Sequence, residues 1–143
     1  MLKTTLTFTQ QDPIMTTNMV QRSEKGWAGH FICSHRCNFR RHTLLSYNDV
    51  FISVSTVGNM IIDYAGKRFE QIGVDRYFET MAFISELKRE NNPWQDGDVS
   101  KQISFTSPLS IDQPWKEQEA NDMHEAVVAE ITAELLAGNR YEH

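Results

Sequence analysis

Long apolar runs are absent from this 143-residue sequence, and no stretch approaches the roughly 18 consecutive apolar residues of a membrane span. The N-terminal segment "MLKTTLTFTQQDPIM" also lacks the apolar core and the small-residue cleavage site of a secretory signal. These two absences argue against a membrane protein and predict a cytoplasmic one. Met15 offers an alternative start, so we expect residues 1–14 to be loose within a chain that forms a single domain over residues 1–143.

Cysteine is scarce, since Cys33 and Cys37 are the only two. On a strand through residues 30 to 39 they would lie about 13 Å apart, at roughly 3.3 Å per residue, which is too far for a disulfide. His30 and His35 could complete a metal-ligand set, but one extended strand cannot surround an ion with four ligands. We therefore interpret the cysteines as small buried hydrophobic residues, with structural zinc as the alternative.

The motifs of the commonest catalytic sites are also missing. There is no P-loop, no dinucleotide-binding glycine fingerprint, no His-Glu-x-x-His and no Gly-x-Ser-x-Gly. We expect a protein that is not an enzyme and that uses no cofactor or metal. The alternative is an enzyme acting on NAD or a nucleotide, because an arginine-bearing strand, "VSTVG" and "YFETMAFISE" follow in an order that resembles ADP-ribosyltransferases. Glu79 or Glu86 would then be the catalytic acid, although the spacing is compressed and the usual Glu-x-Glu pair is missing.

Alternation of apolar and polar residues predicts strands in the middle of the chain. In "GHFICSHRCNF" one face, expected to point inward, carries Phe31, Cys33, His35, Cys37 and Phe39. The other face carries Ile32, Ser34, Arg36, Asn38 and Arg40. His35 is interpreted as a hydrogen-bonded core histidine. A hairpin is expected at Asn48–Asp49, because this turn signal separates two apolar runs.

Further strands and turns are expected downstream. Gly58–Asn59 is predicted to end the β-branched strand "VFISVSTV", and a second hairpin to turn at Ala65–Gly66. Residues 76 to 84 favour a strand, residues 88 to 100 a polar loop, and "KQISFTS" another short strand.

The C-terminal segment gives the clearest helix signal. Met123, Val127, Ile131 and Leu135 recur every fourth residue. Asp112 can cap this helix, Pro114 suits its first turn and Gly138 can end it. The predicted fold class is therefore α+β, an antiparallel β-sheet with a long C-terminal amphipathic helix packed on it.

The polar face of this helix is acidic. It carries Glu117, Glu119, Asp122, Glu125, Glu130 and Glu134. A solvated surface is the simpler interpretation. The alternative is a nucleic-acid mimic that occupies a basic groove on a partner.

One stretch runs against the formal net charge of −5: "GHFICSHRCNFRRHT" holds three arginines and three histidines but no carboxylate. Arginine matches phosphate oxygens with a planar fork of donors, Phe39, Tyr47 or Tyr77 could stack a base, and a turn at "STVGN" could point backbone N–H groups at an anion. A sequence pI near 5.5 disfavours a long nucleic acid and favours a small phosphate-bearing nucleotide. The predicted ligand-binding residues are Arg36, Asn38, Phe39, Arg40, Arg41, Thr56, Asn59, Arg76 and Tyr77. Alternatively, the paired arginines contact acidic residues on the same surface or steady an oligomer interface.

The strings "HRCNFRRHTLL", "ISVSTVGNM", "IGVDRYFETMAF", "DVSKQISF" and "ANDMHEAVVAE" resemble the first-described anti-Thoeris sponge proteins of phages, over residues 27 to about 130. The resemblance implies sequestration, without turnover, of the cyclic ADP-ribose-type signal made by a bacterial TIR-domain sensor. It also implies a homo-oligomer with ligand pockets near its subunit contacts, working in the host cell cytoplasm. The alternative function is an acidic phage inhibitor that blocks a host defence protein by protein–protein contact or by nucleic-acid mimicry.

Overall fold

The computed structural model describes residues 19–25, 34–63, 65, 68–86, 98–103 and 110–141. Over these ranges the elements follow the order β1 (Gln21–Glu24), the 3-10 turn η1 (Ser34–Arg36), β2 (Cys37–Tyr47), β3 (Val50–Asp63), β4 (Arg68–Glu70), β5 (Phe78–Glu86), β6 (Asp98–Ile103), β7 (Ser110–Ile111) and α2 (Glu117–Leu136). All the strands join one antiparallel sheet, so the predicted α+β class is confirmed.

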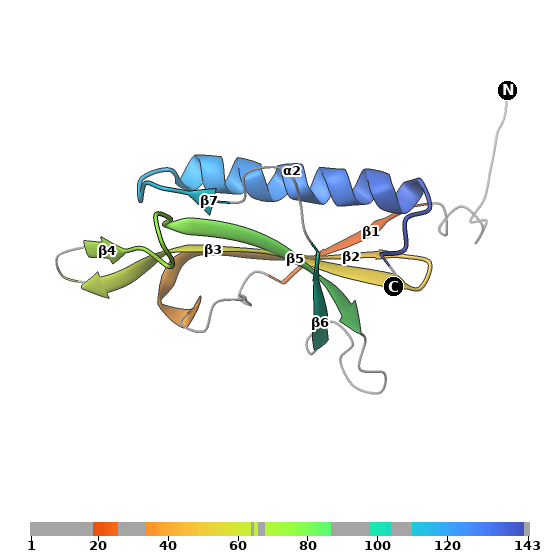
Figure 1. The fold of residues 1–143 in the computed structure, drawn as a ribbon, viewed down its shortest axis with the longest axis horizontal. Coiled ribbons are helices and arrows are strands. Elements are labelled where there is room, and N and C mark those ends of the chain that lie inside the picture. Colours follow the sequence, from red (N-terminus) through yellow and green to blue (C-terminus); the bar gives the residue numbers. More distant parts are fainter. Residues whose placement is uncertain are drawn as a thin grey trace, which may run out of the picture.

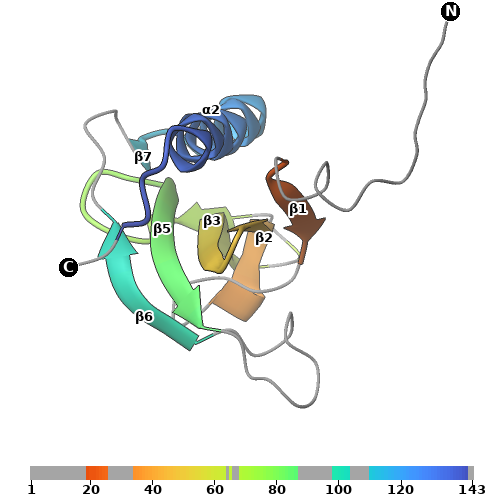
Figure 2. The ribbon, with the colours of Figure 1, turned by 90° about the vertical axis from the view of Figure 1, so that its right-hand side faces the viewer.

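The sheet is a meander with the strand order β1-β2-β3-β5-β6. β4 pairs with the far end of β3, and β7 pairs with the start of β5. The helix α2 runs along one face of the sheet (Figure 1), and the sheet curls beneath it (Figure 2). Among the described residues, no helix is long and apolar enough to cross a membrane.

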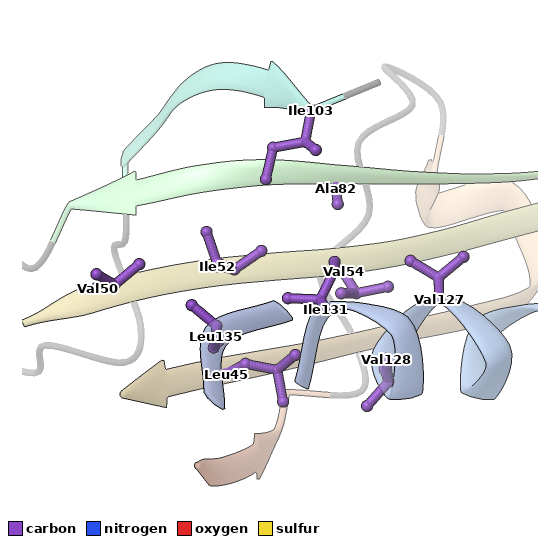
Figure 3. Close-up of a cluster of buried hydrophobic side chains, with 10 residues drawn as sticks. All are labelled: Leu45, Val50, Ile52, Val54, Ala82, Ile103, Val127, Val128, Ile131 and Leu135. Carbon is purple, nitrogen blue, oxygen red and sulfur yellow. The ribbon is translucent and has the colours of Figure 1, made fainter. Parts of the chain in front are cut away.

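The core lies between α2 and the three central strands. Ile131 and Leu135 are at most 1% exposed and face the middle of the sheet (Figure 3). The cluster contains Leu45, Val50, Ile52, Val54, Ala82, Ile103, Val127, Val128, Ile131 and Leu135. The four-residue recurrence in the sequence therefore marks the buried stripe at Val127, Ile131 and Leu135, whereas Met123 is only half-buried.

The ends of the helix match the prediction only in part. α2 begins at Glu117 with Lys116 as its N-cap, and that side chain makes no capping hydrogen bond in the described structure. The expected cap at Asp112 and the expected first-turn place of Pro114 are therefore wrong. Gly138 does end the helix, with a φ of 99° that L side chains rarely adopt.

The strand predicted over residues 30 to 39 is wrong at residues 34–36 and confirmed from Cys37 onward. Ser34–Arg36 form the turn η1 and β2 starts only at Cys37, so His35 is exposed and is not a core histidine. Cys37 is free and buried, as expected. His30 and Cys33 lie outside the described residues.

The hairpin at Asn48–Asp49 is confirmed, because Tyr47 pairs with Val50. The predicted turn at Gly58–Asn59 is wrong. β3 continues to Asp63 and pairs with β4, which confirms the second hairpin. Asn59 takes a φ of 58°, which bends the strand and does not end it.

The two remaining strand predictions are confirmed within the described ranges, whereas the predicted loop is wrong at residues 98–100. The strand predicted over 76 to 84 is β5, and "KQISFTS" lies partly in β6. β6 begins at Asp98, so the end of the predicted polar loop is strand. Residues 1–14, Gly66, the rest of the 88 to 100 loop and residues 104 to 107 lie outside the described part of the chain.

Candidate functional site

The structure distributes the nine predicted ligand-binding residues over three places. Arg41 and Thr56 lie under α2. Arg40 is on the opposite face of β2, because side chains alternate along a strand and Arg41 reaches the helix. The rest gather where η1 and the start of β2 meet the outer half of β3 and the turn before β5: Arg36, Asn38, Phe39, Asn59, Arg76 and Tyr77.

A buried histidine organises the polar contacts beneath the helix. His124 is 0% exposed, and its two ring nitrogens lie 2.7 Å from Thr43 Oγ1 and 2.8 Å from Thr56 Oγ1. Thr56 Oγ1 also lies 2.6 Å from Thr80 Oγ1, so the histidine bonds to β2 and β3 directly and is linked to β5 through Thr56. We call this group, with the ion pairs described next, the polar seam. Its function is structural, because every polar atom of the histidine ring is already bonded.

The polar seam continues outward as a network of ion pairs. Arg41 donates to Glu125 at 2.7 Å, to Glu24 at 2.7 Å and to Asn121 at 2.9 Å. Arg22 donates two hydrogen bonds to the same Glu125 carboxylate, at 2.6 and 2.9 Å. Arg41 is thus committed to holding β1 and β2 against the helix, which is the internal pairing that the sequence left open as an alternative.

These contacts shift the pKa values of the groups involved. Hydrogen bonds from Arg22 lower the pKa of Glu125 to about 2, against the opposing effect of burial. Burial raises the pKa of Glu24, but its hydrogen bonds from Arg22 and Arg41 outweigh burial, so the net direction is downward. Burial, helped by the nearby positive charge of Arg41, lowers the pKa of His124 to about 4. The histidine is therefore neutral at pH 7.

We expect acidification from pH 7 to pH 4 to lower the free energy of unfolding. Below pH 6.5 the unfolded chain protonates His124, whereas the folded chain resists protonation until its pKa of about 4, so stability is lost across this window. His42 has the same sign, because burial and then Lys25 lower its pKa to about 4. Below pH 4.5 the depressed pKa of Glu125 adds a further loss. Urea denaturation at a series of pH values measures the slope, and a flat profile from pH 7 to 4 would contradict the assignment.

Six of the predicted ligand-binding residues gather at the outer half of β3, which we call the β3 end site. The rings of Phe39 and Phe78 meet edge to face with centroids 5.8 Å apart. Asn59 Nδ2 donates to Pro114 O at 2.5 Å and to Glu117 Oε2 at 3.2 Å, and Asn38 also donates to that carboxylate. Asn59 Oδ1 is buried and has no partner among the described residues. The left-handed backbone conformation of Asn59 thus directs its side-chain amide to the start of the helix, which links the sheet to α2.

An open hollow of about 680 Å³ lies beside this site, between β4 and the turn that leads into β5. Tyr77 and Phe69 give it aromatic walls, Gln71 adds an amide, and Glu70 and Asp75 add carboxylates, so any cation for a phosphate would have to come from outside this lining. The main chain around it is paired, since Asn59 N donates to Tyr77 O and Tyr77 N donates to Ile111 O. The segment "STVGN" lies inside β3, so the anion-binding turn expected there is not formed.

Two arginines of the basic stretch have no counter-charge among the described residues. Arg36 is exposed and Arg40 is half-buried, and neither makes a hydrogen bond or ion pair with a described residue. Arg76 differs, because its Nε lies 3.0 Å from Glu79 Oε2. The available positive charge in "HRCNFRR" is therefore carried by Arg36 and Arg40.

For the enzyme alternative, the described residues do not assemble a catalytic site around Glu79 or Glu86. Glu79 is half-buried and held by Arg76. Glu86 is the last residue of β5, and its side chain lies outside the described set. In the part of the chain that is described, no group of three or more histidine, cysteine, aspartate or glutamate side chains is placed to hold a metal ion.

His124 is the residue that sequence reasoning missed. It lies one turn before Val128 and two turns before Ile131 on the apolar face of the helix, so the period of 3.6 already placed it inward. Each of the three strands opposite this face carries one buried threonine, at Thr43, Thr56 and Thr80. These hydroxyls were the sequence signal for a polar partner on the helix.

Comparison with models of known protein families, with curated proteins and with solved structures finds no match. Any assignment of function therefore depends on the residues of the chain itself.

Proposed function

We propose that this protein binds and sequesters a small phosphate-bearing nucleotide signal of the cyclic ADP-ribose type, without turning it over. The observation that carries the proposal is the pair of arginines, Arg36 and Arg40, which have no counter-charge among the described residues although the formal net charge of the chain is −5. A compact anion can be held locally by two such side chains, whereas a long polyanion would be repelled by the remaining acidic surface.

A hollow next to the β3 end site supports a nucleotide. The hollow of about 680 Å³ falls within the roughly 300–1,000 Å³ of small-molecule sites. Tyr77 offers a ring for stacking against a base, and Gln71 offers an amide that can pair with a base edge. In this proposal Arg36 and Arg40 neutralise the phosphates. The resemblance to anti-Thoeris sponge proteins adds a homo-oligomer, a phage origin and the host cytoplasm to the proposal.

The capture experiment uses the protein purified from cells that contain an active TIR-domain signalling system. The protein is denatured, and the released small molecules are identified by mass spectrometry. We expect an intact cyclic nucleotide or ADP-ribose isomer, stoichiometric with protein, that is still intact after prolonged incubation of the native complex. Finding no nucleotide would reject the proposal, and steady consumption of the nucleotide would favour the enzyme alternative.

Arg36→Ala combined with Arg40→Ala is expected to weaken capture at least 100-fold. Each charge-assisted hydrogen bond contributes about 1.5–3 kcal/mol, and every tenfold in affinity corresponds to about 1.4 kcal/mol. The matched control is Arg140→Ala, which removes an exposed arginine that pairs with Asp49 at 2.7 Å. Titration calorimetry with cyclic ADP-ribose, with circular dichroism to confirm folding, makes the comparison. Equal affinity of a folded double variant and the wild type would reject this site. Arg41 is left intact, because its loss would disturb the polar seam.

A further inference from the structure

The six acidic residues on the polar face of α2 divide into two sets of three. Glu125 accepts hydrogen bonds from Arg22 and Arg41, Glu117 accepts from Asn38 and Asn59, and Glu134 accepts from Asn139 and Tyr141. This first set is used to build the fold. The face is therefore only half as available to a partner as the sequence suggested.

The second set is Glu119, Asp122 and Glu130. Glu119 has only a loose contact with Lys116, at 3.8 Å. Asp122 accepts a hydrogen bond from the neutral side chain of Gln118, which leaves its charge in place. No described cation lies within ion-pair distance of Asp122 or Glu130. Within the described part of the chain, Asp122 and Glu130 thus have no cation partner, and Glu119 has only the loose one from Lys116.

These three carboxylates border an apolar groove. β7 lies beside the N-terminal half of α2 (Figure 1), and the two elements enclose a hollow of about 480 Å³. Its apolar lining comes from Ile111 on β7 and from Met123, Ala126 and Val127 on the helix. An apolar lining rimmed by charges of one sign differs from a simple solvated helix face. It can bury an apolar side chain of a partner and, at the same time, form ion pairs with charged residues next to that side chain.

We propose that this groove docks a short basic segment of another protein, with an aliphatic side chain in the groove and cations on its rim. Charge complementarity selects the occupant, since a nucleic acid would be repelled by the carboxylates. Met123 suits such a surface, because its flexible thioether adapts to different apolar side chains. This surface lies on α2 and β7, whereas the β3 end site uses β3, β4 and the turn before β5.

The spacing of the rim defines the segment. Glu119 and Glu130 are eleven residues apart, which at 1.5 Å per residue is roughly 16 Å along the helix. An extended chain covers that distance in about five residues, at roughly 3.3 Å each. The fitting segment therefore carries two arginines or lysines about five residues apart, with aliphatic residues between them.

The test uses a fluorescein-labelled peptide of the sequence GRVLSVRG, which has this spacing, and measures its affinity by fluorescence anisotropy. Neutralising the rim with Glu119→Gln, Asp122→Asn and Glu130→Gln is expected to weaken binding about tenfold or more, since exposed pairs are individually weak but three are removed together. Ala126→Lys, at an exposed position in the groove, should also weaken binding about tenfold. Raising the salt concentration should weaken binding to the wild type.

The matched control removes the same three charges elsewhere, with Asp49→Asn, Glu70→Gln and Asp75→Asn at exposed positions. We expect this control to bind the peptide as the wild type does, and a GEVLSVEG peptide to bind neither. An equal loss in the control would show general attraction to an acidic protein and would overturn the proposal. So would a rim variant that binds normally, or one that changes the sedimentation coefficient of the protein, because the groove would then belong to a contact between copies of this chain.

Discussion

Replacing His124 by alanine lowers the free energy of unfolding by about 3–5 kcal/mol, the range expected when a large buried side chain is removed and buried polar groups lose their partners. The imidazole is fully buried and lies within hydrogen-bond distance of Thr43 and Thr56 on adjacent strands. Alanine leaves a cavity at that point. It also leaves the Thr43 hydroxyl dependent on Glu24 alone and the Thr56 hydroxyl dependent on Thr80.

Urea denaturation at pH 7 measures the loss, and His35→Ala is the matched control. His35 is exposed on η1, so its removal should change the free energy of unfolding by less than about 0.5 kcal/mol. A second comparison separates packing from hydrogen bonding. His124→Leu should be better tolerated when Thr43, Thr56 and Thr80 are all replaced by valine, because removing donor and acceptor together avoids stranded polar groups. If His124→Ala costs less than 1 kcal/mol, the polar seam does not hold the helix.

Gly58→Ala is expected to cost about 3 kcal/mol or more, at the upper end of the usual cost of overpacking. β3 and β5 pair closely here, with Gly58 opposite Phe78, and a Cβ on Gly58 would meet Tyr77 O, the ring of Phe78 and, at 2.7 Å, the Phe78 Cα. Two of these three contacts are backbone atoms, which cannot rotate away as a flexible side chain could. The strands would have to separate, and Tyr77 would move with them.

The control for this prediction is Gly138→Ala, at a site where a Cβ meets nothing within 4 Å but where φ is 99°. Only backbone strain operates there, so we expect a smaller loss of about 1–2 kcal/mol. Thermal denaturation ranks the two variants. In the proposed function, Gly58→Ala also weakens nucleotide capture, whereas Gly138→Ala leaves capture unchanged. A loss at Gly58 no greater than at Gly138 would show that the close pairing is easily relieved.

The sequence predicted those helices and turns that depend on a pattern of nearby residues. The recurrence of Val127, Ile131 and Leu135 marked the helix, because one buried stripe on α2 is what the core requires. The turn at Asn48–Asp49 was visible for the same reason, since two residues suffice to specify a tight hairpin.

The use of individual charges was not predictable in this way. Arg40 and Arg41 are adjacent and chemically identical, yet only Arg41 reaches Asn121 and Glu125, which lie 80 and 84 residues further along the chain. Which face of the strand meets the helix depends on the whole fold, so no local pattern separates the two arginines. The same applies to the acidic residues of α2, which divide between internal contacts and a groove that β7 completes.

Asn59 shows why the end of β3 was misjudged. Glycine followed by asparagine usually marks a turn, and Asn59 does take the left-handed conformation of turn residues. Here that conformation directs its amide to Pro114 and Glu117 while the strand continues to Asp63. The local signal was correct about the backbone of one residue and wrong about the path of the chain.

The position of α2 after every strand of the sheet has a consequence for synthesis. At about 5–20 residues per second, the ribosome needs roughly 1–4 s to make the 20 residues of this helix, whereas a β-hairpin forms in about 1–10 μs. During those seconds only water can take the place of His124 beside Thr43 and Thr56, and the apolar residues around them are uncovered. A translational pause within α2 therefore prolongs the interval in which the nascent sheet can aggregate or recruit a chaperone.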